Sequence, residues 1–130
     1  MSEGLELHDA EVGAITHQLG MAVITIVGAT LHRSEGVAGV DPGSCWLQAA
    51  EIVVHRTALP QQLPKLPGWL LDGTVKTADV EHSNVLYTPF RVDEACTLEL
   101  VFDNDIAFNV AAGGVELRLI GEASYLREFR

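Results

Sequence analysis

The sequence has few cysteines, and those it has are not arranged for the usual cysteine chemistry. Cys45 and Cys96 lie far apart, and neither belongs to a CxxC pair. That spacing excludes the common ligand pattern of structural zinc and of thioredoxin-type redox motifs. We expect two free thiols, as is usual in a reducing cytosol, with a mutual disulfide as the less favoured alternative. A domain of this length removes roughly two thirds of its unfolded surface from water and needs neither disulfides nor metal for a stable core.

Long apolar runs are also missing. The most apolar stretch, residues 21–31, is interrupted by Thr25, Gly28 and Thr30, and it is much shorter than the about 20 residues of a spanning helix. We therefore expect no membrane insertion. Residues 1–11 carry four acids and no Lys or Arg, which is unlike a secretory signal. The sequence predicts a cytoplasmic protein.

Positive charge is scarce. The chain has 8 Lys and Arg residues against 18 Asp and Glu residues, and its formal net charge is -10. Nucleic-acid affinity depends largely on Lys and Arg neutralising phosphates, so a nucleic-acid partner is not expected. A basic protein is the partner that this charge favours, because fields of opposite sign accelerate encounter. Solubility is the simpler use of the same charge.

Apolar residues alternate with polar ones along much of the chain. Residues 97–102 and 106–112 each place apolar side chains on one face, with Asp103-Asn-Asp between them, which predicts a hairpin. After a Gly-Gly turn, residues 115–119 alternate again and are expected to form the third strand of a meander. Strands are also expected at 48–59 and 73–80.

The N-terminal half predicts a further hairpin. Residues 21–32 are rich in β-branched side chains on both faces, which favours a long strand covered on both sides. Its partner is residues 12–18, joined through Leu19-Gly20. A short helix capped by Asp9 is the alternative, and Gly13 disfavours it.

Two loops and the tail complete the fold prediction. Residues 33–46 and 60–69 are rich in Gly and Pro and are expected to be irregular. In the tail, residues 121–129, apolar spacing slightly favours a short helix over a final strand. We predict one domain, residues 1–130, forming an antiparallel β-sandwich or barrel of roughly seven to eight strands, with at most one short C-terminal helix. An exposed edge strand would permit a homodimer.

Five histidines are the first candidates for chemistry. A metal site would need several ligands to converge from different strands, and His8, His32 and His82 with Asp9 or Glu35 are the pieces available. No pair has the His-x-His or His-x-x-x-His spacing that places two ligands on one face. Hydrogen-bonded or solvated histidines are therefore favoured over a metal site.

Nucleophilic catalysis has little support. The serines lie in no GxSxG context, and Cys45, in residues 43–46 (GSCW), would be an activated thiol only if a histidine approached it. A semi-buried inert thiol is the favoured alternative. We assign no catalytic residue and no cofactor. Trp46 and Trp69 end the two irregular segments, where they form either a binding rim or, the favoured reading, lids folded back over the open ends of the fold.

Several short motifs carry a family resemblance. They are residues 7–9 (LHD), 29–36 (ATLHRSEG) with 39–43 (GVDPG), and 121–126 (GEASYL). Together they resemble a group of small, functionally uncharacterised bacterial β-domain proteins. The resemblance implies a compact cytoplasmic all-β domain and no assigned activity. It makes a shared patch of His8, Asp9, His32, Arg33 and Glu35 the first place to look for a site.

The sequence thus favours a non-enzymatic binding or protein-interaction module whose acidic face or loop rim meets another macromolecule. An acidic antidote that blocks a basic toxin is one specific form of this hypothesis. The alternatives are the metal-binding protein or metal-dependent enzyme described above and a small-molecule pocket between the long loops. The expected binding residues are His8, Asp9, His32, Arg33, Glu35, Trp46 and Trp69.

Overall fold

The computed structural model describes residues 2–130, and these form ten antiparallel β-strands with no helix among them. The strands are β1 (Ser2–Gln18), β2 (Met21–Ser34), β3 (Gly43–His55), β4 (Gly68–Lys76), β5 (Glu81–Ser83), β6 (Val85–Tyr87), β7 (Arg91–Val92), β8 (Cys96–Phe102), β9 (Ala107–Ala112) and β10 (Gly114–Phe129). The predicted antiparallel all-β fold is confirmed. Three short strands, β5 to β7, raise the strand number above the prediction. Within residues 2–130, no helix has the length and apolar character needed to cross a membrane.

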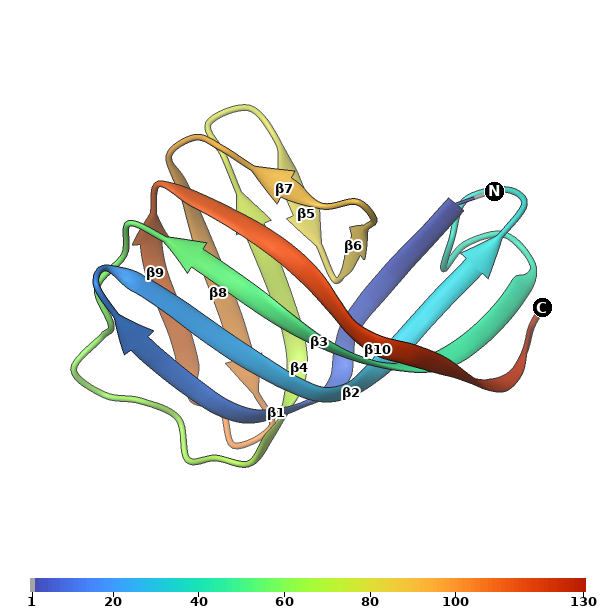
Figure 1. Ribbon diagram of the computed structural model, residues 1–130, viewed down its shortest axis with the longest axis horizontal. Coiled ribbons are helices and arrows are strands. Elements are labelled where there is room, and N and C mark those ends of the chain that lie inside the picture. Colours follow the sequence, from blue (N-terminus) through green and yellow to red (C-terminus); the bar gives the residue numbers. More distant parts are fainter. Residues whose placement is uncertain (1) are drawn as a thin grey trace.

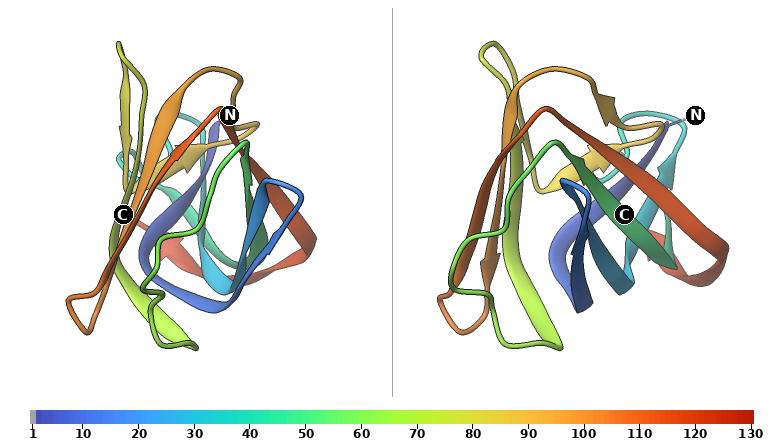
Figure 2. Two further views of the ribbon diagram at one scale, coloured as in Figure 1. Left: turned by 90° about the vertical axis from the view of Figure 1, so that its left-hand side faces the viewer. Right: turned by 60° about the vertical axis from the view of Figure 1, so that its left-hand side comes forward.

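The strands are hydrogen-bonded in the order β7-β10-β3-β2-β1-β4-β8-β9, while β5 pairs with β4 and β6 with β1. Four long strands, β10, β3, β2 and β1, form one layer, and β4, β8 and β9 form a second layer that faces one half of the first (Figures 1 and 2). The other half of the long strands extends beyond the second layer. We call this half the arm; it comprises residues 2–8, 29–34, 43–48 and 122–129.

The four long strands bend where the arm begins. Register shifts interrupt β1 between Glu6 and Glu11, β2 between Ile26 and Ala29, and β10 between Ile120 and Ser124. Each shift inserts extra residues into one strand, as a bulge does: one in β2, two in β10 and three in β1. Such insertions increase the local twist. The backbone at Asp9 (φ 65) and Gly121 (φ 72) adopts the left-handed conformation that such kinks use. Aligned bulges in neighbouring strands therefore bend the whole layer.

Most of the core lies between the two layers, and it continues into the arm through Leu5, Leu7 and Leu31. Alternation along β8 and β9 buries one face, so the predicted hairpin between these strands is confirmed. The expectation that both faces of residues 21–32 are covered is wrong for the first half of β2. There Ile24 and Ile26 are buried but Val27 is exposed, because no second layer covers the outer face. The largest fully buried side chains include Phe102, Phe108, Leu5, Leu7, Ile24, Ile52, Leu98 and Leu100.

The structure corrects the predicted third strand of the meander. Strand β10 pairs with β3 and β7, not with β9. The chain changes layers at residues 113–114, where the amide of Gly113 donates to the carbonyl of His55 at 2.8 Å. That bond draws the chain away from β9 and starts the ladder between β10 and β3.

The tail is a strand and not the favoured helix. Ser124, Tyr125 and Arg127 pair with Leu47, Trp46 and Cys45. A register shift between Tyr125 and Arg127 accounts for the helix-like spacing of the apolar residues. The helix alternative for residues 12–18 is likewise wrong, since they continue β1 and pair with β2.

The first irregular segment is shorter than predicted, and the second is longer, because β3 already ends at His55. Strand β2 runs to Ser34 and β3 begins at Gly43, so only residues 35–42 form the connecting loop. Strand β4 begins at Gly68, at the end of the second loop. Cys45, Trp46 and Trp69 therefore lie in strands, where ladder hydrogen bonds fix the direction in which each side chain points.

Candidate functional site

The structure does not bring the expected binding residues into one patch. It divides them among three places: an open hollow at the bend that contains Asp9 and Trp69, a cluster in the arm that contains Arg33 and Trp46, and a buried group around His32. Glu35 lies on the exposed rim of the Arg33 cluster, and His8 lies next to Asp9 on β1.

The hollow at the bend is built by four adjacent strands. Its volume is about 210 Å³, and we call it the Trp69 hollow. The β1–β4 ladder pairs Glu11 with Trp69, and the β1–β2 ladder pairs Glu11 with Gly28, so these residues lie in one cross-strand row. The lining residues are Asp9, Glu11, Val27, Gly28, Ala29, Thr30, Leu47 and Trp69.

The Trp69 hollow exists because of the bulges and because Gly28 has no side chain. Val27 is an extra residue in β2 and is displayed outward, with 54% of its surface exposed. A Cβ on Gly28 would lie 3.1 Å from Cδ1 of Leu47, so a side chain there would fill the space between the walls. Trp69 is 50% exposed, which contradicts the lid expectation for this indole. The hollow thus has a half-exposed indole in its wall.

Two carboxylates border the Trp69 hollow. The Asp9 side chain is largely exposed, and its only ion pair within residues 2–130 is with Nε2 of His8 at 3.4 Å. The Glu11 carboxylate forms no ion pair with any side chain of those residues. The rim therefore carries negative charge that the described part of the chain leaves mostly uncompensated.

His8 is held beside this rim. Its Nδ1 lies 2.7 Å from the carbonyl oxygen of Leu71 in β4. That hydrogen bond, and after it the charge of Asp9, raises the pKa of His8 above its ordinary value of 6.5. Both effects favour the protonated imidazole, whose charge offsets part of Asp9 but leaves Glu11 untouched.

Trp46 packs against its neighbours in the arm and forms a hydrogen bond with one of them. The Arg33 guanidinium lies 4.5 Å from the centre of the Trp46 ring, and Arg33 Nε donates to Glu3 at 3.0 Å. On another side the Tyr125 ring meets Trp46 edge to face at 5.4 Å. The indole Nε1 donates to Oγ of Ser44 at 2.8 Å. This indole therefore packs within the arm, in a strand, and is not a lid over an end of the two-layered fold, while Arg33 is already paired with Glu3.

His32 is buried in the arm, with 4% of its surface exposed. Its Nε2 lies 3.2 Å from Oε1 of Glu6, and its Nδ1 lies 3.6 Å from Sγ of Cys45. Sequence reasoning did not single out Glu6. No spacing signal could have done so, because the contact depends on the register between β1 and β2.

The three candidate metal-ligating histidines do not meet. His8 faces Leu71, His32 lies between Glu6 and Cys45, and His82 packs edge to face on Phe90 at 5.1 Å. Across residues 2–130, no group of three His, Cys, Asp or Glu side chains is placed to hold one metal ion. The structure thus supplies no ligand set for the metal-binding alternative in this part of the chain.

We found no match to this chain among protein-family models, curated proteins or solved structures. Its function is therefore inferred from its own side chains.

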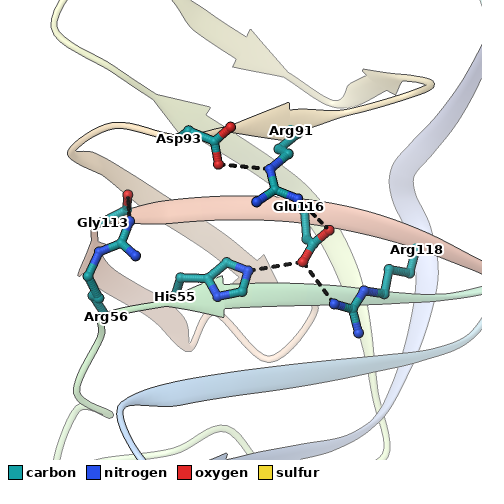
Figure 3. Close-up of polar contacts among 7 residues, drawn as sticks. All are labelled: His55, Arg56, Arg91, Asp93, Gly113, Glu116 and Arg118. Carbon is teal, nitrogen blue, oxygen red and sulfur yellow. Dashed lines mark hydrogen bonds and ion pairs between the residues drawn. The ribbon is translucent and has the colours of Figure 1, made fainter.

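A polar cluster that the sequence did not indicate surrounds Glu116 on β10 (Figure 3). Oε1 of Glu116 lies 3.0 Å from Nε2 of His55 and accepts from Arg118 at 3.0 Å, while Oε2 lies 3.6 Å from Arg91. The hydrogen bond from His55, and then the contacts with Arg118 and Arg91, lower the pKa of Glu116 below its ordinary 4.5.

The cluster holds three arginines and two carboxylates, and each arginine has a partner within it. Arg91 also donates to Asp93 at 2.8 Å, and Arg56 donates to the carbonyl of Gly113. The cluster connects β3, β7 and β10 (Figure 3). Because each arginine is already bonded within the cluster and the contacts join three strands, we interpret it as structural. Of these places, the Trp69 hollow is the one that combines exposed apolar surface with unpaired charge.

Proposed function

We propose that this protein is a non-enzymatic binding module and that the Trp69 hollow takes a long basic side chain, Lys or Arg, from a partner protein. The observation that carries the proposal is a half-exposed indole that lines one hollow together with two carboxylates, those of Asp9 and Glu11. A cation over an aromatic face is attracted by the ring quadrupole, and a nearby carboxylate adds Coulomb attraction.

The size of the hollow favours a side chain over a free small molecule. Pockets for drug-sized ligands usually enclose about 300–1,000 Å³ and bury most of the ligand. The Trp69 hollow measures about 210 Å³ and is open. Val27 and Leu47 offer apolar walls to the methylene stem of a Lys or Arg, while the charged head reaches the rim.

The charge of the whole chain supports the same class of partner. A net charge of -10 attracts a basic protein before contact and raises the association rate, an effect that falls as salt rises. The hollow would then supply the short-range specificity that net charge alone does not give. An acidic antidote that covers a basic protein is one biological form of this activity.

The test uses a fluorescently labelled oligo-lysine peptide, with oligo-glutamate as the charge control, and follows anisotropy at low salt. We expect the double variant Asp9→Asn/Glu11→Gln and the variant Trp69→Ala to weaken oligo-lysine binding at least about fivefold, since a cation–π contact contributes about 1 kcal/mol.

The matched control is Glu94→Gln/Glu99→Gln, which removes the same charge from exposed positions away from the hollow. This control should weaken binding much less. Equal weakening by both double variants, or no effect of Trp69→Ala, would mean that the hollow is not the binding site.

A further inference from the structure

Three groups with complementary chemistry lie in a row across the arm. Cys45 on β3 is directly opposite His32 on β2, and Glu6 reaches the same imidazole from β1. Sγ of Cys45 lies 3.6 Å from Nδ1 of His32, and Oε1 of Glu6 lies 3.2 Å from Nε2. A nucleophile, a base and a group that orients the base are thus consecutive neighbours, the arrangement that activates a thiol.

The carboxylate of Glu6 determines which nitrogen of the His32 imidazole carries the proton. An ionised Glu6 only accepts hydrogen bonds, so Nε2 of His32 carries the proton that it donates to Glu6. In the neutral imidazole Nδ1 is then the unprotonated nitrogen, and this is the atom that faces the Cys45 thiol. With Glu6 ionised and His32 neutral, this arrangement places a base, and not a second donor, beside the sulfur.

In this structure the Cys45 thiol is not accessible to a reagent. Cys45 is fully buried, and this burial raises the pKa of its thiol. The Phe129 ring stands edge to face against His32 at 5.0 Å, and Arg127 is the ladder neighbour of Cys45 on β10. The end of β10 therefore covers one side of the site, while the loop of residues 35–42 also lies against His32, since a Cβ on Gly39 would be 3.8 Å from its Cδ2.

That cover is the end of an edge strand. Residues 124–129 pair with β3, one register shift precedes them and a second interrupts their ladder, and no other strand of residues 2–130 pairs with them. The segment runs to the tip of the arm (Figure 1). Strand ends with few partners open locally at much lower free energy than the core. Opening here would uncover Cys45 without disturbing the two-layered half of the molecule.

We propose that Cys45 is a latent nucleophile, activated by His32 and Glu6, which the end of β10 covers and which reacts with low-molecular-weight disulfides when that end is released. Nδ1 of His32 takes the thiol proton, and the thiolate attacks one sulfur of the disulfide. The sulfur–sulfur bond of the reagent breaks, a mixed disulfide forms on Cys45, and the departing thiolate takes the proton from His32. This activity is independent of the Trp69 hollow.

The chain contains its own reference thiol. Cys96 on β8 is also buried, but the charged groups that act on it are Glu94 and Arg56, with no imidazole among them. A change that opens only the arm should therefore affect Cys45 and leave Cys96 unchanged.

The experiment measures the rate of reaction with dithiodipyridine, whose released thiol absorbs light. In a Cys96→Ala background, where Cys45 is the only thiol, Phe129→Ala should raise the rate about tenfold or more, because local opening limits it. Phe129→Leu, which keeps an apolar cover, should raise it less. In a Cys45→Ala background, Phe129→Ala should leave the Cys96 rate unchanged.

The activating role has a separate readout. Adding Glu6→Gln to the Cys96→Ala/Phe129→Ala protein should slow the reaction severalfold, although Cys45 stays equally uncovered. Circular dichroism confirms that each variant is folded. Acceleration of Cys96 together with Cys45 would indicate global unfolding and overturn the proposal. So would an unchanged Cys45 rate in Phe129→Ala, or no slowing by Glu6→Gln.

Discussion

Nε2 of His55 lies 3.0 Å from Oε1 of Glu116, and this contact joins β3 to β10 at the centre of a cluster that also holds Arg118 and Arg91. The Glu116 side chain is only 14% exposed. Its carboxylate therefore matters for stability, because a largely buried charge whose partners remain in place cannot be removed without leaving donors unsatisfied.

Glu116→Gln should lower the free energy of unfolding by about 1–2 kcal/mol at neutral pH. Because the folded protein lowers the pKa of Glu116, its contribution is complete above the ordinary value of 4.5 and is lost as pH falls through the folded pKa. Urea unfolding across this range should show the difference between wild type and Glu116→Gln shrinking below about pH 4.5. A difference that stays constant through acid pH would contradict the assigned cause; Glu99→Gln is the exposed control.

The ring of His8 should titrate above its ordinary 6.5, because the Leu71 carbonyl and then Asp9 favour the charged form. NMR of the histidine ring protons measures this directly. In Asp9→Asn the pKa of His8 should fall but stay raised, since the bond to Leu71 remains. A wild-type value at or below 6.5 would show that the pairing at the rim is not formed in solution.

Gly28→Val tests the shape of the Trp69 hollow. The new Cβ would lie 3.1 Å from the mobile end of Leu47, an exposed side chain that is able to move aside. We expect the melting temperature to change little and oligo-lysine binding to fall, because the space between the walls is filled. Undiminished binding by a folded Gly28→Val protein would indicate that the peptide binds elsewhere.

Leu98→Ala should destabilise the fold by about 2–5 kcal/mol, since Leu98 is fully buried between the layers and its loss leaves a cavity. Leu71→Ala, at an exposed position on β4, is the matched control and should cost much less. Chemical denaturation of both variants checks the assignment of the core. A similar loss of unfolding free energy in the two variants would contradict the two-layered arrangement.

The sequence predicted those parts of the fold that depend on neighbours along the chain. The hairpins β1–β2 and β8–β9 follow from alternation on either side of a short turn. Alternation shows which face of a strand is buried but not which strand lies beside it. The pairing of β10 with β3, which joins distant segments, could therefore not be found in this way.

The candidate sites depend on register even more strongly. A shift of one residue turns every side chain of a strand to the opposite face, and the bulges of β1 and β2 set the register here. Asp9 and Trp69 were each expected to bind, but only the β1–β4 ladder brings them together. Glu6 gave no signal of its own, because its role exists only through its contact with His32.

The most direct test of the proposed binding site is a two-dimensional NMR titration of the intact protein with oligo-lysine at low salt, following the two indole N–H signals. Trp69 is exposed in the hollow, whereas Trp46 is stacked against Arg33 and Tyr125. We predict a saturable shift of the Trp69 signal with little change at Trp46. A Trp69 signal that stays still while resonances of acidic residues shift over the whole surface would contradict the proposed function.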